Sequence, residues 1–162
     1  MNRQQLHSAL ASATASTFEE LALLLASPDA DADQRAAPLA AGVRLDFTGP
    51  FAGCVVVRTT ADVLAAAAAN MLGADGPPPE SLRRDALGEL ANVICGNLLP
   101  VVAGGRAVFD LHAPRWTGAA PDDALAHDAL GAPAADVCIG LEGGRAEVAL
   151  HLAPDGAARA GA

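Results

Sequence analysis

The sequence predicts a fold of the α/β (α+β) class, in which a mainly antiparallel sheet has helices packed on one of its faces. Strand-like segments come in two pairs, each joined by a short turn, and strands joined in this way run antiparallel. Helical segments stand between the pairs rather than alternating with single strands. The chain of 162 residues is long enough for one domain with a sizeable core.

The composition of the chain ends sets the expected domain limits. Residues 1–16 are polar and alanine-rich, so we expect a flexible N-terminus that is frayed or weakly helical. We expect a single domain over residues 17–152 and a flexible C-terminus over residues 153–162. The domain begins with a helix over residues 17–25, which Pro28 ends.

The first pair of strands follows an acidic stretch. Residues 29–38 contain few large apolar side chains, so we expect a linker with little capacity to fold. Residues 42–48 alternate between apolar and polar side chains, and residues 53–59 form a β-branched run, which together predict a hairpin. Thr60 or Asp62 can then cap a helix that continues to about residue 72, where a glycine ends it.

The longest helical pattern extends over residues 80–99. It begins after a run of three prolines, meets Pro100, and can continue past it, with a kink, to two glycines at 104 and 105. Its periodicity predicts a buried stripe at every third or fourth residue. The members of that stripe are Leu87, Leu90, Ile94, Leu98 and Val101.

The second pair of strands comes near the C-terminus. Residues 106–111 predict one further strand, after which Trp116 is expected on a loop, either as a cap on the core or as part of a contact surface. Residues 137–141 and 145–152 then predict a hairpin around the Glu142–Gly144 turn.

The polar side of the central helix has an unusual composition. Asp85, Glu89 and Asn92 are spaced so that they stack on one face. Gly88 and Gly96 lie beside them, although glycine within a helix costs about 1 kcal/mol relative to alanine. Either the glycines let a partner approach the helix closely, or they relieve crowding against a neighbouring element of the same chain.

Composition excludes several classes of function. The formal net charge is −9 and no basic stripe is present, which argues against nucleic acid and against polybasic membrane contacts. No apolar run reaches the roughly 20 residues of a membrane helix. All basic residues are arginines, so a lysine nucleophile is excluded. We expect no signal peptide and a cytoplasmic location.

Sulfur and metal chemistry are also not expected. Three cysteines, at 54, 95 and 138, each lie in an apolar run without another cysteine or histidine at metal-ligand spacing, so they are interpreted as core residues. The potential ligands Asp122, Asp123, His127 and Asp128 match no metal-binding pattern. We therefore predict no metal site.

The central helix resembles a known motif. Asp85-x-x-x-Glu89-x-x-Asn92, followed by Gly96 and Asn97, is similar to the motif of the CheC/CheX/FliY family of chemotaxis phosphatases, and the phrase from Asp85 to Asn92 is most similar to the CheX branch. The order of the elements around it, over residues 17–152, matches the same branch. The resemblance implies a CheC-like fold.

The resemblance also implies a function. Family members hydrolyse the aspartyl phosphate of a phosphorylated CheY-like response regulator. Glu89 would pair with the active-site lysine of the regulator, and Asn92 would orient the attacking water. The protein would need no cofactor of its own, because the regulator supplies Mg²⁺. A homodimer is implied as well.

Three features limit what is carried over. The N-terminal helix lacks a second copy of the motif, so we predict one site per chain, as in CheX. The segment around Trp116 departs from the family, which leaves the identity of the regulator open. Asp85 is assigned a supporting role, and the alternatives for it are pairing with Arg84 or another exposed arginine, or interaction with the helix dipole in the first turn. The alternative function is a non-catalytic adaptor that binds a receiver domain or another signalling or flagellar-switch protein.

Overall fold

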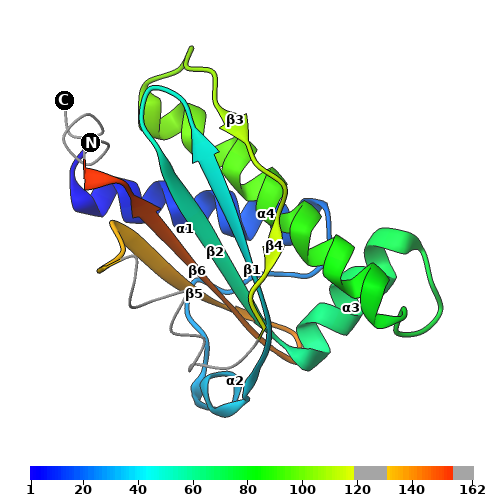
Figure 1. Ribbon diagram of the computed structural model, residues 1–162. Coiled ribbons are helices and arrows are strands. Elements are labelled where there is room, and N and C mark those ends of the chain that lie inside the picture. Colours follow the sequence, from blue (N-terminus) through cyan, green and yellow to red (C-terminus); the bar gives the residue numbers. More distant parts are fainter. Residues whose placement is uncertain (119–130, 155–162) are drawn as a thin grey trace.

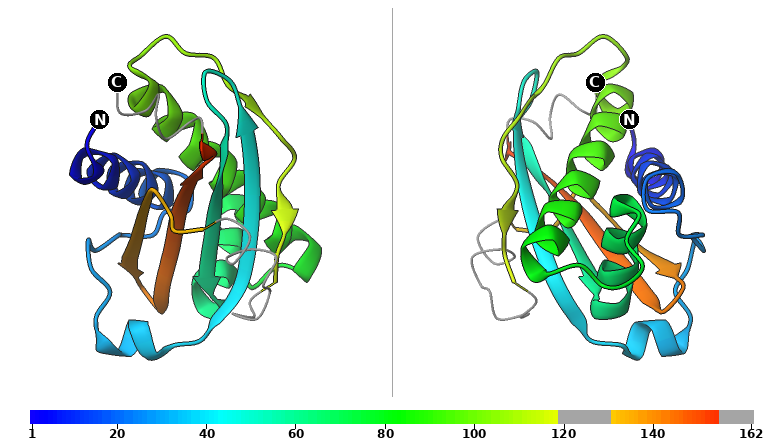
Figure 2. Two further views of the ribbon diagram at one scale, coloured as in Figure 1. Left: turned by 60° about the vertical axis from the view of Figure 1, so that its left-hand side comes forward. Right: turned by 90° about the vertical axis from the view of Figure 1, so that its right-hand side faces the viewer.

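The computed structural model describes residues 1–118 and 131–154. In these ranges the strands form one antiparallel sheet in the order β3-β1-β2-β6-β5, and β4 also pairs with β1 (Figure 1). Helices α1, α3 and α4 lie on one face of the sheet, as Figure 2 shows in edge view. The predicted class is therefore confirmed. The helices are α1 (Arg3–Glu20), α2 (Ala32–Ala36), α3 (Ala61–Leu72) and α4 (Glu80–Ala103). The strands are β1 (Leu39–Thr48), β2 (Gly53–Thr60), β3 (Asp110–Leu111), β4 (Arg115–Trp116), β5 (Ala135–Leu141) and β6 (Gly144–Leu152).

Both predicted hairpins are present, and they join side by side through β2 and β6. Val57 is paired with Val43 of β1 on one side and with Val148 of β6 on the other. Because side chains alternate across a strand, these three valines face the same way, and all are buried under the helices. The core thus lies between the sheet and the α1–α3–α4 layer.

The N-terminal helix differs from its prediction. It covers Arg3–Glu20 rather than residues 17–25, and it crosses the expected boundary between a frayed N-terminus and the domain. Asn2 and Gln5 form a capping box, with Gln5 N donating to Asn2 Oδ1 at 2.8 Å. Leu6 and Leu10 are buried in the core cluster. Packing of this apolar stripe stabilises a helix whose local sequence gives only a weak signal.

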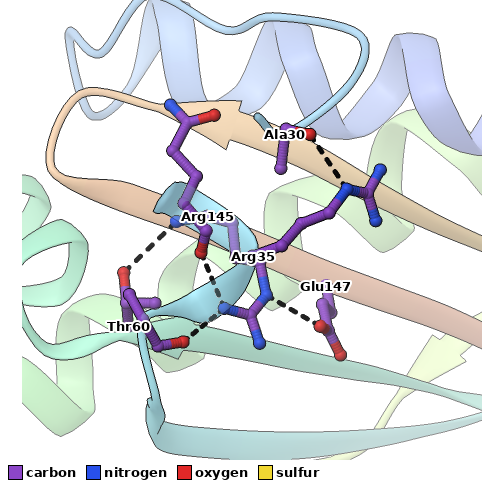
Figure 3. Close-up of polar contacts among 7 residues, drawn as sticks. Ala30, Arg35, Thr60, Arg145 and Glu147 are labelled. Carbon is purple, nitrogen blue, oxygen red and sulfur yellow. Dashed lines mark hydrogen bonds and ion pairs between the residues drawn. The ribbon is translucent and has the colours of Figure 1, made fainter. Parts of the chain in front are cut away.

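The acidic stretch 29–38 also folds, contrary to expectation. It contains the short helix α2, whose N-terminus is stabilised by a second capping box, between Asp31 and Gln34. The buried Arg145 of β6 donates from Nη1 to the carbonyls of Gln34, at 2.8 Å, and Ala37, and from Nε to Glu147 at 2.8 Å (Figure 3). This arginine ties the stretch to the end of the sheet, a long-range contact that composition does not reveal.

Glycines end two helices as predicted. Gly73 and Gly104 adopt left-handed conformations, with φ of 63° and 84°, directly after α3 and α4. Helix α4 continues through Pro100 to Ala103. Val101, predicted to belong to the buried stripe, is 55% exposed, and Val102 is buried instead. Val102 follows Leu98 at a spacing of four residues and so continues the buried face of the helix.

The segment after α4 forms an interrupted edge strand. Residues 106–111 were predicted as one strand, but only Asp110–Leu111 is extended and paired, and β4 follows three residues later. Both short strands pair with the free edge of β1. Pro114 lies between them and cannot donate a hydrogen bond to the sheet. Trp116 consequently belongs to the sheet and not to a loop.

Some predictions concern residues that the structure does not describe. Asp122, Asp123, His127 and Asp128 lie outside the described ranges, as do residues 155–162. Among the described residues there is no group of three or more histidine, cysteine or acidic side chains arranged to hold a metal ion.

One described helix, α4, is long and apolar enough to cross a membrane by length and composition alone. In its most apolar window, 56% of the residues are buried inside the fold. Burial against a sheet is the arrangement expected of a core helix.

Candidate functional site

Helix α4 presents the predicted polar residues on the side opposite its core contacts. Leu87, Leu90 and Ile94 are fully buried, and this apolar anchor fixes the rotation of the helix. Asp85 and Glu89 are consequently exposed, and Asn92 is half-buried.

A groove runs between this face of α4 and the edge of the sheet at β4. Its volume is about 250 Å³. One wall comes from α4, and the other comes from β1 and the β3–β4 segment. The lining residues are Val43, Arg84, Asp85, Gly88, Glu89, Asn92, Pro114 and Trp116. Four of the five residues singled out in the sequence therefore lie at one site, and Gly96 lies one turn further along the same helix.

The two glycines of α4 have different surroundings. A Cβ atom on Gly88 would lie 3.3 Å from both Cβ and Cγ of Pro114, so the absence of a side chain allows the β3–β4 segment to pack closely. A Cβ atom on Gly96 would meet nothing within 4 Å among the described residues. Relief of crowding within the chain thus accounts for Gly88 but not for Gly96, which is exposed.

The polar side chains of the motif have no hydrogen-bond or ion-pair partner among the described residues. Arg84 pairs with Glu80 at 2.7 Å rather than with Asp85. Glu80 is also the acidic residue of the first turn of α4, where the helix dipole acts most strongly. In the ranges 1–118 and 131–154, the side chains of Asp85, Glu89 and Asn92 make no hydrogen bond or ion pair. All three are available to a partner.

Trp116, which the sequence suggested as a core cap or a contact residue, lines the groove together with Arg84, which the sequence analysis did not single out as a groove residue. The guanidinium carbon of Arg84 lies 4.6 Å from the centre of the indole ring, a cation–π contact. Trp116 is half-buried and packs against the core cluster, so it is both a cap on the core and a part of the surface. A strand of two residues is too short to show alternation, which explains why β4 was not predicted.

An ion pair on the other face of the sheet fastens β4 in place. Arg115 Nη2 lies 2.6 Å from Asp46 Oδ2, and Arg44 Nη2 lies 2.6 Å from Asp46 Oδ1. Burial on its own raises the pKa of Asp46, but hydrogen bonds from the two arginines outweigh it and hold that pKa below its ordinary value. The carboxylate therefore stays charged and keeps Arg115, and with it Trp116, against β1.

The cysteines do not contribute to this site. Cys54 and Cys95 are buried, and burial raises the pKa of Cys54 to about 11 and that of Cys95 to about 12. Both thiols are neutral at ordinary pH, and a neutral thiol is a poor nucleophile. Their interpretation as core residues agrees with this burial.

Comparisons with known proteins agree with the resemblance of the central helix. The family model for the chemotaxis phosphatase CheX matches residues 41–117, which include most of β1 and all of α4 and β4. No curated protein sequence matches the chain. Because the sequence similarity to solved structures is low, those structures inform on the fold alone.

Three solved structures illustrate the shared fold. The chemotaxis protein CheX from Desulfovibrio desulfuricans has a TM-score of 0.66 at 16% identity, covering 92% of this chain and 99% of that chain. CheX from Vibrio vulnificus has a TM-score of 0.64 at 15% identity, covering 94% and 99%. CheX from Borrelia burgdorferi, in a complex described as CheX-CheY-BeF3-Mg, has a TM-score of 0.62 at 13% identity, covering 90% and 96%.

The match to the family model depends on the residue pattern of the central region, whereas the likeness to the solved structures depends on the path of the backbone. Together they confirm the resemblance to the CheX branch of the CheC/CheX/FliY chemotaxis phosphatase family.

Proposed function

We propose that this protein hydrolyses the aspartyl phosphate of a CheY-like response regulator. The observation that carries the proposal is the pair Glu89 and Asn92. They lie one turn apart on the outer face of a buried helix, in the region matched by the CheX model, and neither makes a hydrogen bond or ion pair within the described residues. The complex of the Borrelia burgdorferi CheX with CheY supports the choice of partner class.

The chemistry requires little more than positioning from this chain. A water oxygen attacks phosphorus in line with the bond to the regulator's aspartyl oxygen; the new P–O bond forms as that bond breaks, and inorganic phosphate and a free aspartate result. Phosphoryl transfer of this kind depends mainly on orientation and charge stabilisation. In our proposal the metal ion, Mg²⁺, and the aspartyl phosphate both belong to the regulator.

Each residue of the pair has a defined part in this scheme. The Asn92 amide both donates and accepts hydrogen bonds and does not titrate, so it can hold the attacking water without a change of charge. Holding the water removes an entropic part of the barrier. The Glu89 carboxylate pairs with the regulator's lysine and docks the helix. Asp85, one turn before Glu89, adds negative charge on the same face and has a supporting role.

Two further properties belong to the proposal through the resemblance. They are assembly as a homodimer and a cytoplasmic location, where receiver domains are found.

The direct test is the rate of phosphate loss from phosphorylated regulators of the same cell. We expect the protein to accelerate this loss. Asn92→Ala should reduce the accelerated rate of phosphate loss by about 100-fold or more, because it deletes a hydrogen-bonding group that orients the water. Glu89→Ala should weaken both binding of the regulator and turnover. Glu142→Ala, at an exposed glutamate in the β5–β6 turn, is the control and should behave as wild type.

The outcomes separate the two candidate functions. Acceleration that survives both Glu89→Ala and Asn92→Ala would move the active site away from α4. Binding to regulators without any acceleration, over the whole set tried, would favour the non-catalytic adaptor.

A further inference from the structure

We propose that the groove beside Glu89 and Asn92 recognises an apolar side chain of the regulator, and that Trp116, with Arg84 held on its ring, sets the affinity for that partner. This inference rests on the proposed function, because it takes the regulator as the occupant of the groove. It concerns Trp116 of β4 and Arg84 of α4, which lie outside the stretch from Asp85 to Asn92.

The first argument is the composition of the wall. Val43, Pro114 and Trp116 give the sheet side of the groove an apolar surface. The helix side carries the carboxylates of Asp85 and Glu89, which are unpaired among the described residues, and its cation, Arg84, is paired with Glu80. A regulator surface with an apolar side chain beside its lysine complements both sides at once. The lysine meets the carboxylates, and the apolar side chain lies against the indole and the proline.

The second argument is that the wall is already in place without the partner. Arg84 is fixed from two directions, by the ion pair with Glu80 at 2.7 Å and by the Trp116 ring at 4.6 Å. Arg115, the neighbour of Trp116, is fixed to Asp46 at 2.6 Å. A surface that is ordered in advance loses less conformational entropy on binding. Tryptophan and arginine are also the residue types that most often dominate binding energy.

The third argument is the separation of roles within the groove. Asn92 and Glu89 act on the water and the lysine, while Trp116 lies across the groove on β4, where it can contact the regulator without touching the reacting atoms. Such a contact is equally strong in the ground state and in the transition state. Its loss therefore raises KM and leaves kcat nearly unchanged.

Trp116 is the only tryptophan in the chain, so it reports on its own environment. We would titrate the Asn92→Ala variant, which lacks turnover, with a phosphorylated regulator that contains no tryptophan, and follow indole emission. The emission should shift and saturate. In steady-state assays, Trp116→Leu should raise KM by about tenfold, the effect of losing one strong interface contact, with kcat within about twofold of wild type.

Two further variants keep the test decisive. Arg84→Met removes the guanidinium but keeps the tryptophan and a helix-forming side chain, and it should raise KM by a smaller factor; it also covers the case in which Trp116→Leu does not fold. Val108→Ala, at a side chain that is 80% exposed and far along the segment from the groove, is the control and should change neither constant.

The possible failures are distinguishable. If the wild type hydrolyses the phosphate but the indole emission of Asn92→Ala does not change on titration, recognition by Trp116 and Arg84 is refuted. The same conclusion follows if KM is unchanged in both Trp116→Leu and Arg84→Met. In either case the proposed phosphatase function stands. An emission change with no hydrolysis of any regulator would overturn the proposed function and support the groove as a docking site.

Discussion

Gly96 provides the sharpest test of how the exposed face of α4 is used. It lies inside a helix, it is exposed, and a Cβ atom there would meet nothing within 4 Å among the described residues. Alanine at such a position should therefore stabilise the fold by about 0.5–1 kcal/mol, since it restricts the unfolded chain and favours helix. For a chain of this size the gain corresponds to a rise in Tm of about 1–4 °C.

The same substitution should weaken binding of the regulator. If the glycine lets the partner approach the helix, a methyl group at that point overfills the contact, which costs about 1–3 kcal/mol in packed interiors. We expect Gly96→Ala to raise the dissociation constant by about fivefold or more. The variant should thus be more stable and bind less well, a combination that damage to the fold cannot produce.

Gly88→Ala is the matched comparison on the same helix. Its added Cβ would lie 3.3 Å from Cβ and Cγ of Pro114, closer than an ordinary van der Waals contact, so strain offsets the gain in helix propensity. We expect its Tm to rise less than that of Gly96→Ala, or to fall. Thermal unfolding followed by far-UV circular dichroism and titration with a regulator measure both quantities.

Two results would refute this reasoning in different places. Gly96→Ala that is less stable than wild type would show that the position is not open space. Gly96→Ala that is more stable and binds the regulator as tightly as wild type would confirm the stability argument and reject close approach of a partner at Gly96.

Three further predictions concern the rest of the fold. Arg145→Ala should destabilise the protein by about 1–3 kcal/mol in urea unfolding, because two backbone carbonyls of the α2 segment lose their donor. Since the pKa of Asp46 is lowered in the folded state, its contribution to stability is present above the ordinary pKa and is lost as the pH falls through the folded value. Asp46→Asn should therefore reduce the free energy of unfolding at pH 7, and the difference from wild type should shrink at acidic pH. Alkylation of the native protein at pH 8 should label the half-buried Cys138 well before Cys54 and Cys95, whose burial raises the pKa of their thiols to about 11 and about 12.

Each of these predictions has its own control. Arg35 donates one hydrogen bond, from Nε to the Ala30 carbonyl at 2.9 Å, and its side chain is 54% exposed. Arg35→Ala should therefore cost less than Arg145→Ala, about 1 kcal/mol or less, and an equal loss from both arginines would contradict the role given to Arg145. If the free energies of unfolding of Asp46→Asn and wild type differ by the same amount at pH 7 and at acidic pH, the lowered pKa of Asp46 is contradicted. Equal labelling rates for the three thiols in the native state would mean that the two buried cysteines are reached by solvent.

Local periodicity allowed much of the site to be predicted. The spacing of Asp85, Glu89 and Asn92 placed them on one face of a helix, and the apolar stripe through Leu87 and Ile94 determined that this face would be the exposed one. The structure agrees on both points. Their catalytic roles stay predictions, because the geometry of one chain does not test them.

The second wall of the groove could not be predicted in the same way. Trp116 and Pro114 belong to a segment whose strands are two residues long, and its pairing with β1 depends on residues about 70 positions away, such as Asp46. Short strands have no measurable alternation, and long-range ion pairs leave no local pattern.

The sequence by itself therefore determined the class of the fold, the two hairpins and the orientation of α4, since each follows from side-chain periods of two or 3.6 residues within one segment. Only the tertiary structure decided that residues 3–16 form part of α1, that α2 folds against Arg145, and that β4 closes the groove. These features obtain their stability from burial and hydrogen bonds between distant segments, and such contacts exist only once the chain has folded.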